Sequence, residues 1–158
     1  MIRVPAKVHR TFGLAVRAEE AFALMRDVPR WGRLFPHTDA IDGLEEHGPN
    51  VWRWTMEPLG PPGGRVRTVY ACRYVFDADA LTVRWTPVPD VGNASFRGHV
   101  SLSPRQPDQT RGSLELQAVL EIPAPRFVAG IVRATLAVEF GRMTDLFLKR
   151  LAKDVRNL

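Results

Sequence analysis

The stretch AEEAFALMRDVPRWGRLFPH, residues 18–37, decides how this chain folds. Its first part has helical spacing: Ala18 and Phe22 share one face, and two glutamates occupy the first turn, where they favour a helix. Asp27 can cap a second helix, in which Pro29 takes a tolerated early position. The stretch therefore predicts two short helices within a chain whose other segments mostly alternate.

Alternation of apolar and polar residues predicts strands on both sides of these helices. Residues 7–16 alternate before them, with Arg10 as the one charged side chain in an otherwise apolar row. The strands after them are separated by short turns, which fits an antiparallel meander because parallel pairs need longer crossovers. We expect these later strands at residues 52–57, 65–77, 81–86, 95–102 and 113–122, and a hairpin-type loop at PLGPPGG, residues 58–64.

The closing segment, residues 126–158, has helical periodicity and contains no proline. From Phe140 onward its apolar residues form one stripe, whereas the apolar residues of its first half spread around most of the circumference. We therefore expect the first half to be buried on several sides. Together the segments predict an α+β fold: a curved antiparallel sheet, two short helices after the first strand, and a long C-terminal helix that the sheet grips. Such a sheet can leave a ligand chamber under the helix; a thick solid core is the alternative.

Composition limits the class of protein. The chain has 158 residues, 45% hydrophobic and 25% charged, which fits one globular domain covering residues 1–158. No apolar run approaches the roughly 20 residues of a membrane span, and the N-terminal residues lack the pattern of a secretory signal, so we expect a cytoplasmic protein. The net charge is +5, but the arginines are scattered singly, which argues against nucleic acid as a partner. Cys72, the only cysteine, cannot form an internal disulfide.

The segment DVPRW…LFPH, with Asp27, Trp31 and Pro36 at matching positions, resembles the opening motif of the START/Bet v 1-like (SRPBCC) superfamily. This superfamily has the helix-grip fold and includes polyketide cyclases, aromatases and coenzyme Q-binding proteins. The order of elements extends the resemblance over essentially the whole chain. The motif is structural and carries no catalytic residue, so the resemblance implies a chamber and not a particular activity.

Polar residues offer little that points to chemistry. The four histidines, His9, His37, His47 and His99, have no spacing that would gather metal ligands, and no cofactor-binding motif is present, so we expect neither metal nor cofactor. His37 could transfer protons at the mouth of a chamber or could be an ordinary exposed loop histidine. Catalytic residues cannot be assigned from the sequence.

The aromatic residues are the better candidates for a binding site. Several recur on one face of neighbouring predicted strands, and hydroxyl groups among them would suit a chamber better than a dry core. Ordinary core packing is the competing interpretation. The predicted ligand-binding residues are Trp31, Trp54, Tyr70, Tyr74, Trp85, Phe96, Phe127, Ile131 and Thr135.

Three functions remain open. The first is binding or transport of a hydrophobic small molecule, such as a lipid, isoprenoid or polyketide-like compound, between the sheet and the last helix. The second is a cyclase or dehydratase that uses the same chamber, which requires an ionisable residue pointing inward. The third is a protein-interaction module. The sequence favours the first over an enzyme and leaves the ligand, the oligomeric state and the pathway undefined.

Overall fold

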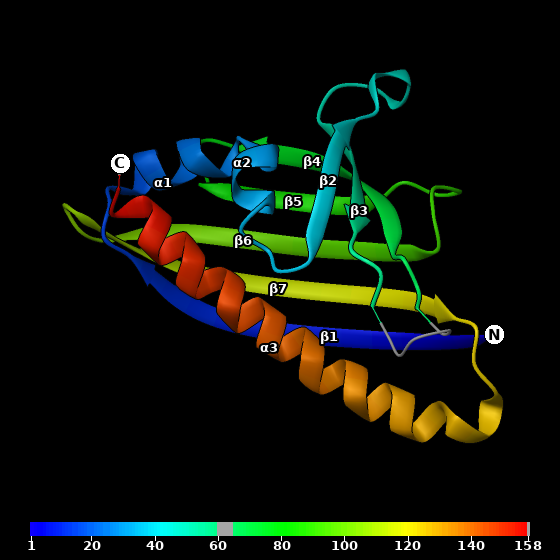
Figure 1. Ribbon diagram of the computed structural model, residues 1–158. Helices are drawn as coiled ribbons and strands as arrows, with labels where there is room; N and C mark the ends of the chain where they lie inside the picture. The colour runs from blue at the N-terminus through cyan, green and yellow to red at the C-terminus, as the bar shows by residue number, and fades with distance from the viewer. Residues whose placement is uncertain (60–64, 158) are drawn as a thin grey trace.

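The protein is an α+β molecule in which a long helix crosses one antiparallel sheet, as the sequence predicts (Figure 1). The computed structural model describes residues 1–59 and 65–157. Two short helices follow the first strand, and the other strands come before the long C-terminal helix. The elements are β1 (Ile2–Leu14), α1 (Ala18–Met25), α2 (Val28–Gly32), β2 (Thr38–Gly43), η1 (Glu45–His47), β3 (Val51–Met56), β4 (Val69–Asp77), β5 (Thr82–Pro87), β6 (Ala94–Gln106), β7 (Gln109–Ile122), η2 (Arg126–Val128) and α3 (Ala129–Val155).

The seven strands are ordered β1-β7-β6-β5-β4-β3-β2, and every neighbouring pair is antiparallel. Strands β2 to β7 form the predicted meander, and β1 joins it beside β7. Two large rings of the inner face lie opposite glycines: Trp85 pairs with Gly98 and Phe12 with Gly112. A Cβ atom at either glycine would overlap the facing ring, so both positions need glycine for the rings to lie against the sheet.

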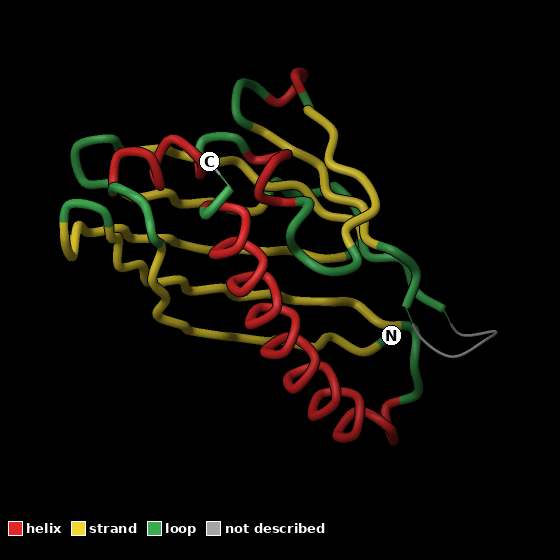
Figure 2. Tube along the Cα trace, turned by 60° about the vertical axis from the view of Figure 1, so that its left-hand side comes forward, coloured by secondary structure: helices red, strands yellow, loops and turns green. Residues whose placement is uncertain are grey.

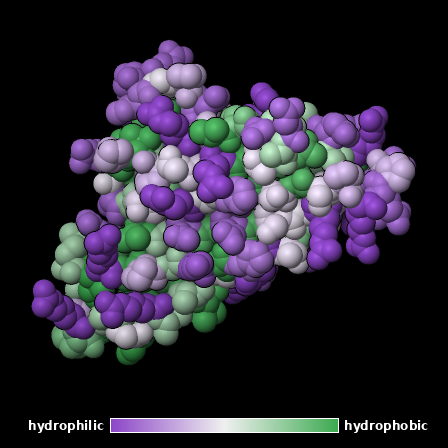
Figure 3. Space-filling model, turned by 180° about the vertical axis from the view of Figure 1, so that it is seen from behind, coloured by the Kyte–Doolittle hydropathy of each residue, from purple (hydrophilic) through white to green (hydrophobic). Residues whose placement is uncertain are grey.

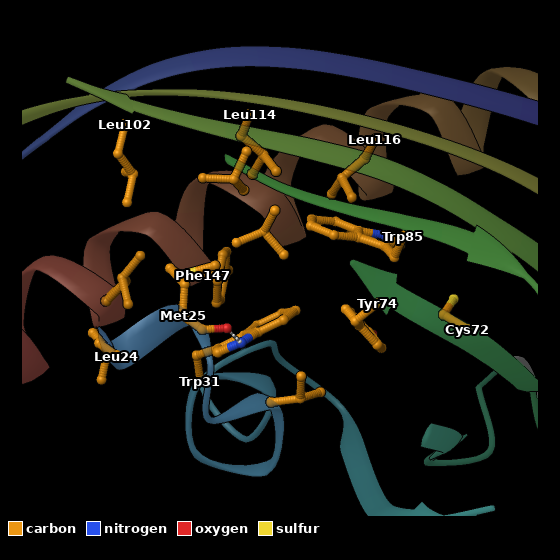
Figure 4. Packing of buried hydrophobic residues seen from close by; sticks show 14 of the residues in the cluster. Leu24, Met25, Trp31, Cys72, Tyr74, Trp85, Leu102, Leu114, Leu116 and Phe147 are labelled. Atoms are coloured by element: carbon orange, nitrogen blue, oxygen red, sulfur yellow. Dashed lines mark hydrogen bonds between the residues drawn. The ribbon is translucent and has the colours of Figure 1, made fainter. Parts of the chain in front are cut away.

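The short helices take the geometry that their sequence dictates. The Asp27 carboxylate accepts a hydrogen bond from the Arg30 amide at 3.3 Å and caps α2, as predicted. The Trp31 indole donates to the Met25 carbonyl oxygen at 3.0 Å (Figure 4), which joins α2 to the end of α1. These contacts point Trp31 into the core, where it is 4% exposed.

The main hydrophobic core lies between the inner face of the sheet and the three α-helices. The predicted alternation is confirmed for β4, β6 and β7, whose inward residues are largely buried. A smaller cluster lies apart from it and contains Val51 and Ala71 together with Leu44 and Val88. This cluster explains the burial of Ala71, which lies on the outer face of β4, whereas Val75 on the same face is 59% exposed.

Helix α3 is held mainly through its second half. Phe140, Phe147 and Leu151 are buried, as their predicted stripe requires. The first half departs from the prediction: it is mostly exposed rather than buried on several sides, and both Figure 1 and Figure 2 show it projecting past β1. The apolar residues of a helix show which faces avoid water, but not whether a neighbour covers them. Arg10, the charged residue in the row of β1, pairs with Asp145 of α3 at 2.7 Å.

Several elements also differ from the sequence prediction: β1 begins at Ile2 rather than at residue 7, and β6 and β7 extend further toward their shared turn than predicted. Strand β2, residues 38–43, was not expected, because its sequence TDAIDG shows weak alternation and only partial burial. Strand β4 begins at Val69 rather than Arg65, although Leu59 and Val66 form an isolated bridge before it. Helix α3 begins at Ala129, after a 3₁₀ turn. The predicted loop at residues 58–64 lies largely outside the described residues.

Candidate functional site

Six of the nine predicted site residues line one internal cavity between the sheet and the helices. Trp54, Tyr70, Tyr74, Trp85 and Phe96 come from neighbouring strands, because alternate positions of adjacent strands share a face. Trp31 reaches the cavity from α2 on the opposite side. The complete lining is Met25, Trp31, Phe35, Trp54, Tyr70, Tyr74, Trp85, Phe96, Val100, Leu114, Leu116 and Phe147.

Trp31 is the centre of the aromatic arrangement (Figure 4). The centroid of its ring lies 5.6 Å from that of Trp54, 5.8 Å from Trp85, and 6.0 Å from both Tyr74 and Phe147. These separations and the tilted planes suit aromatic pairs, which avoid face-to-face stacking without offset. The Trp31 indole on α2 therefore contacts rings of both the sheet and α3.

A second set of rings extends along the sheet. Tyr70 stacks on Phe96 with centroids 4.0 Å apart and lies nearly parallel to Trp54 at 5.8 Å. Phe96 in turn meets Phe140 of α3 edge-on at 6.0 Å. A row of contacting rings therefore runs from the cavity lining to Phe140, near the middle of α3.

The polar atoms of the lining are hydroxyl and indole groups. The Trp54 indole donates to the Tyr74 hydroxyl oxygen at 2.9 Å, so this hydroxyl accepts one hydrogen bond and still carries its own proton, close to the Cys72 sulfur. Burial, aided by the nearby Cys72, raises the pKa of Tyr70 and of Tyr74 well above the ordinary value. Both phenols therefore stay protonated and act as hydrogen-bond donors over the physiological pH range.

The cavity is small, with a volume of about 30 Å³. That is room for about one or two water molecules, whereas pockets for small-molecule ligands measure roughly 300–1,000 Å³. The side chains therefore nearly fill the chamber that the sequence predicts.

The sequence matches the model of one protein family over residues 5–156, the polyketide cyclase/dehydrase and lipid transport family. The chain belongs to this family. The match covers the whole sheet except the first residues of β1, together with all of α3. The predicted START/Bet v 1-like resemblance is confirmed.

Solved structures of family-like proteins share the fold at low identity. Zhui aromatase/cyclase from a Streptomyces species is 17% identical with a TM-score of 0.75, over 96% of this chain and 94% of that one. A START superfamily protein from Mycobacterium smegmatis is 17% identical with a TM-score of 0.60, over 96% and 97% of the two chains. A point mutant of norcoclaurine synthase from Thalictrum flavum is 13% identical with a TM-score of 0.64, over 99% and 98%. No curated protein matches the sequence.

The sequence analysis did not identify the aliphatic residues of the lining, or Phe35 and Phe147, as site residues. Val100, Leu114 and Leu116 lie in strands that the sequence predicts, but nothing local separates a cavity-facing leucine or valine from any other in the core. Phe147 lies on the predicted stripe of α3, and its ring centroid is 5.5 Å from that of Phe35. Only the packing of α3 brings these two rings together.

The other three predicted site residues lie away from the cavity. Phe127 is 87% exposed and Ile131 is 72% exposed, and Thr135 is exposed as well. All three belong to the projecting start of the C-terminal helical segment, so they could line a chamber only if that segment moved toward the sheet. In this structure they face solvent.

The candidate polar chemistry also lies elsewhere. His37 is partly exposed, with its Nδ1 atom 3.4 Å from a Glu57 carboxylate oxygen, and it is not part of the cavity lining. Among the described residues, no three His, Cys, Asp or Glu side chains are grouped so that they could hold a metal ion. Cys72 is buried, its thiol donates to the Phe96 carbonyl at 3.4 Å, and burial raises its pKa to about 12. Cys72 therefore has the surroundings of a residue that packs the core.

Folding gathers part of the basic charge that the sequence scatters. An open groove of about 580 Å³ lies where β1 ends and the β6–β7 hairpin turns. Arg105 and Arg111 line this groove from the β6–β7 hairpin, and Arg156 reaches it from the end of α3. The groove is at the opposite end of the sheet from η2. It shares no described lining residue with the aromatic cavity.

Proposed function

We propose that this protein binds a hydrophobic small molecule between the sheet and α3, in the position now occupied by the aromatic cavity. The observation that carries the proposal is the lining itself: aromatic rings from four strands, from α2 and from α3 face one void. Large apolar and aromatic surfaces with a few polar groups are typical of ligand sites. Membership in a family described by lipid transport and polyketide cyclisation supports the same class of ligand.

Binding requires the helical wall of the cavity to move. The void of about 30 Å³ is about a tenth of the smallest usual ligand pocket. The strands on one side are joined by continuous ladders, whereas the other wall consists of Met25, Trp31, Phe35 and Phe147 from α1, α2, the following turn and α3. The helices are therefore the part that opens to admit a ligand.

The phenols give the ligand a preferred orientation. Tyr70 and Tyr74 remain protonated because burial raises the pKa of each. A ligand with one acceptor group, such as a carbonyl or hydroxyl oxygen, can accept from these phenols while its apolar body contacts the rings. We therefore infer a ligand that is mostly apolar and carries a weakly polar end.

Acid–base catalysis finds less support in this cavity. No lining residue in the described chain is a carboxylate, a histidine or an amine. Such groups carry most general acid–base steps at neutral pH. The structure therefore offers no observation that favours a cyclase or dehydratase over a binding protein.

Tryptophan fluorescence can test ligand binding directly. Trp31, Trp54 and Trp85 line the cavity, so an apolar ring with one hydroxyl, such as naphthol, should quench the emission saturably. Phe35→Leu alters the helical wall and should change the naphthol affinity severalfold. Phe12→Leu is the matched control, because Phe12 is partly buried but lies over Gly112, outside the lining.

The ligand retained from the cell gives a second readout. Native mass spectrometry of the purified protein should show a bound mass that organic extraction removes. Absence of a bound mass together with absence of saturable quenching would refute the proposal. Equal responses of Phe35→Leu and Phe12→Leu would show that the probe binds outside the cavity.

A further inference from the structure

The first half of the C-terminal helical segment carries an apolar stripe that nothing in the described chain covers. Phe127 is 87% exposed, Ile131 72% and Val138 73%, and Ala134 is also exposed. Ile131, Ala134 and Val138 are spaced i, i+3 and i+7, which places them on one side of α3, and Phe127 lies just before that helix in the 3₁₀ turn η2. We call these four residues the α3 stripe.

The α3 stripe faces away from the rest of the protein. The buried residues of α3 begin at Phe140, and Arg150 and Asp154 tie its last turns to α2 and the turn after it. Arg10 holds the middle of the helix through Asp145. Beyond that point the helix projects past β1, and Figure 3 shows hydrophobic side chains at the corresponding corner of the surface, mixed with hydrophilic ones.

The charges beside the stripe have one predominant sign. Residues 126–142 contain Arg126, Arg133 and Arg142 but only one acidic residue, Glu139, so the segment carries a net charge of 3 − 1 = +2. All three arginines are exposed, and Glu139 lies 3.4 Å from Arg142. A second copy of the chain would bring the same positive segment against this one. A surface of negative charge would be attracted instead.

We propose that the α3 stripe docks this protein on a lipid bilayer that contains anionic headgroups. The apolar residues enter the boundary between headgroups and acyl chains while the arginines stay at headgroup level, as in helices that lie in the membrane interface. The stripe spans eleven residue steps, about 17 Å, which suits a segment lying flat on the surface. None of the described helices is long and apolar enough to cross a membrane.

This docking goes beyond ligand binding and does not depend on it. If the proposed function also holds, docking would place the protein on the bilayer, where an apolar ligand is dissolved. Attachment to a bilayer can nevertheless be measured with the cavity empty. The two proposals can therefore fail separately.

Vesicle sedimentation tests the proposal. The whole protein should pellet with vesicles of equimolar phosphatidylcholine and phosphatidylserine, and much less with phosphatidylcholine alone. Phe127→Ser with Ile131→Ser should lower the partition coefficient at least tenfold, because burying one such side chain contributes about 1.5–3 kcal/mol and about 1.4 kcal/mol corresponds to a factor of ten. Both residues are exposed, so the fold should be unaffected, which circular dichroism can verify.

Val75→Ser is the matched control. Val75 is an apolar residue that is 59% exposed, but it lies on β4 and far along the chain from the stripe. This variant should bind vesicles as the wild type does. A charge variant, Arg126→Gln with Arg133→Gln, should weaken binding to the anionic vesicles severalfold and reduce its dependence on salt concentration.

Three results would overturn the proposal. The first is a wild-type protein that does not bind the anionic vesicles. The second is equal binding by the stripe variant and Val75→Ser. The third is a stable dimer of the wild-type protein that the stripe variant converts to a monomer, since a second copy would then cover the stripe. Naphthol quenching in the same variants distinguishes these outcomes from failure of the proposed function, because the stripe variant should keep that response.

Discussion

Replacement of Gly98 by alanine tests how tightly the aromatic site is packed. Gly98 on β6 lies directly opposite Trp85 on β5. A Cβ atom at this position would overlap the indole of Trp85, so the ring must move or the strands must separate. Trp85 is only 4% exposed, and its ring is packed within 6 Å of the rings of Trp31 and Tyr74, with centroids 5.8 Å and 5.7 Å away.

The magnitude follows from two opposing effects. Overpacking a well-packed core costs about 1–3 kcal/mol. The void of about 30 Å³ beside the ring relieves part of the strain, and alanine also restricts the unfolded chain, which returns about 0.4–1 kcal/mol. We expect a net loss of about 1–2 kcal/mol in the free energy of unfolding. For a domain of this length, that lowers the melting temperature by roughly 2–8 °C.

Urea unfolding followed by circular dichroism at 25 °C measures this loss. Gly13→Ala is the matched control, since a Cβ atom there meets only the Thr110 carbonyl oxygen, at 3.9 Å. Near-ultraviolet circular dichroism should change for Gly98→Ala alone, because the Trp85 ring moves. If both variants are equally stable and give the wild-type spectrum, Trp85 does not rest on Gly98 and our account of the site is wrong.

Further predictions concern three residues: Tyr74, Cys72 and Gly130. Tyr74→Phe removes the acceptor of the Trp54 indole and should cost about 1–3 kcal/mol in urea unfolding, because a buried donor is left unpaired; an unchanged midpoint would show that water replaces the hydroxyl. The thiol of Cys72, whose pKa burial raises from 9.0 to about 12, should react with Ellman's reagent at pH 8 only after unfolding, and rapid labelling of the native protein would contradict its burial. The native state holds the thiol proton more tightly than the unfolded state, so the thiol should cause no pH dependence of stability below pH 9. As the pH rises from 9 toward 12, the free energy of unfolding should fall. Cys72→Ala should make thermal unfolding less sensitive to pH in that window. Gly130→Ala should raise stability by about 0.5 kcal/mol, since an added Cβ atom in this helix meets nothing within 4 Å; a loss of stability would mean that the start of α3 packs against another surface.

The sequence located most of the sheet face that forms the site because strand alternation is a local property. Trp54, Tyr70 and Phe96 could be assigned to one face from their positions alone, and the structure places them around one void. Trp31 could be assigned to a short helix because the Asp27 cap of that helix is also a local signal. Strand β2 escaped detection because an edge strand that buries little needs little alternation.

The remainder of the site could not be read from the sequence. Phe35 and Phe147 are 112 positions apart in the chain, and only the path of α3 makes them neighbours. Phe127 and Ile131 show the opposite error. Their apolar character was taken as evidence of burial, but both are exposed, in the part of the helical segment that projects past β1 (Figure 1). Hydrophobicity records a preference for leaving water and not the partner that satisfies it.

The sequence by itself determined the order of the elements apart from β2, the sheet faces that turn inward and the aromatic character of the interior, because caps, turns and alternation act between residues close in the chain. The tertiary structure decided the volume of the cavity, the exposure of the α3 stripe and the gathering of Arg105, Arg111 and Arg156 in one groove. Each of these depends on how far α3 and the curved sheet lie from one another. That separation is the result of many side-chain contacts between distant segments, and no local pattern specifies it.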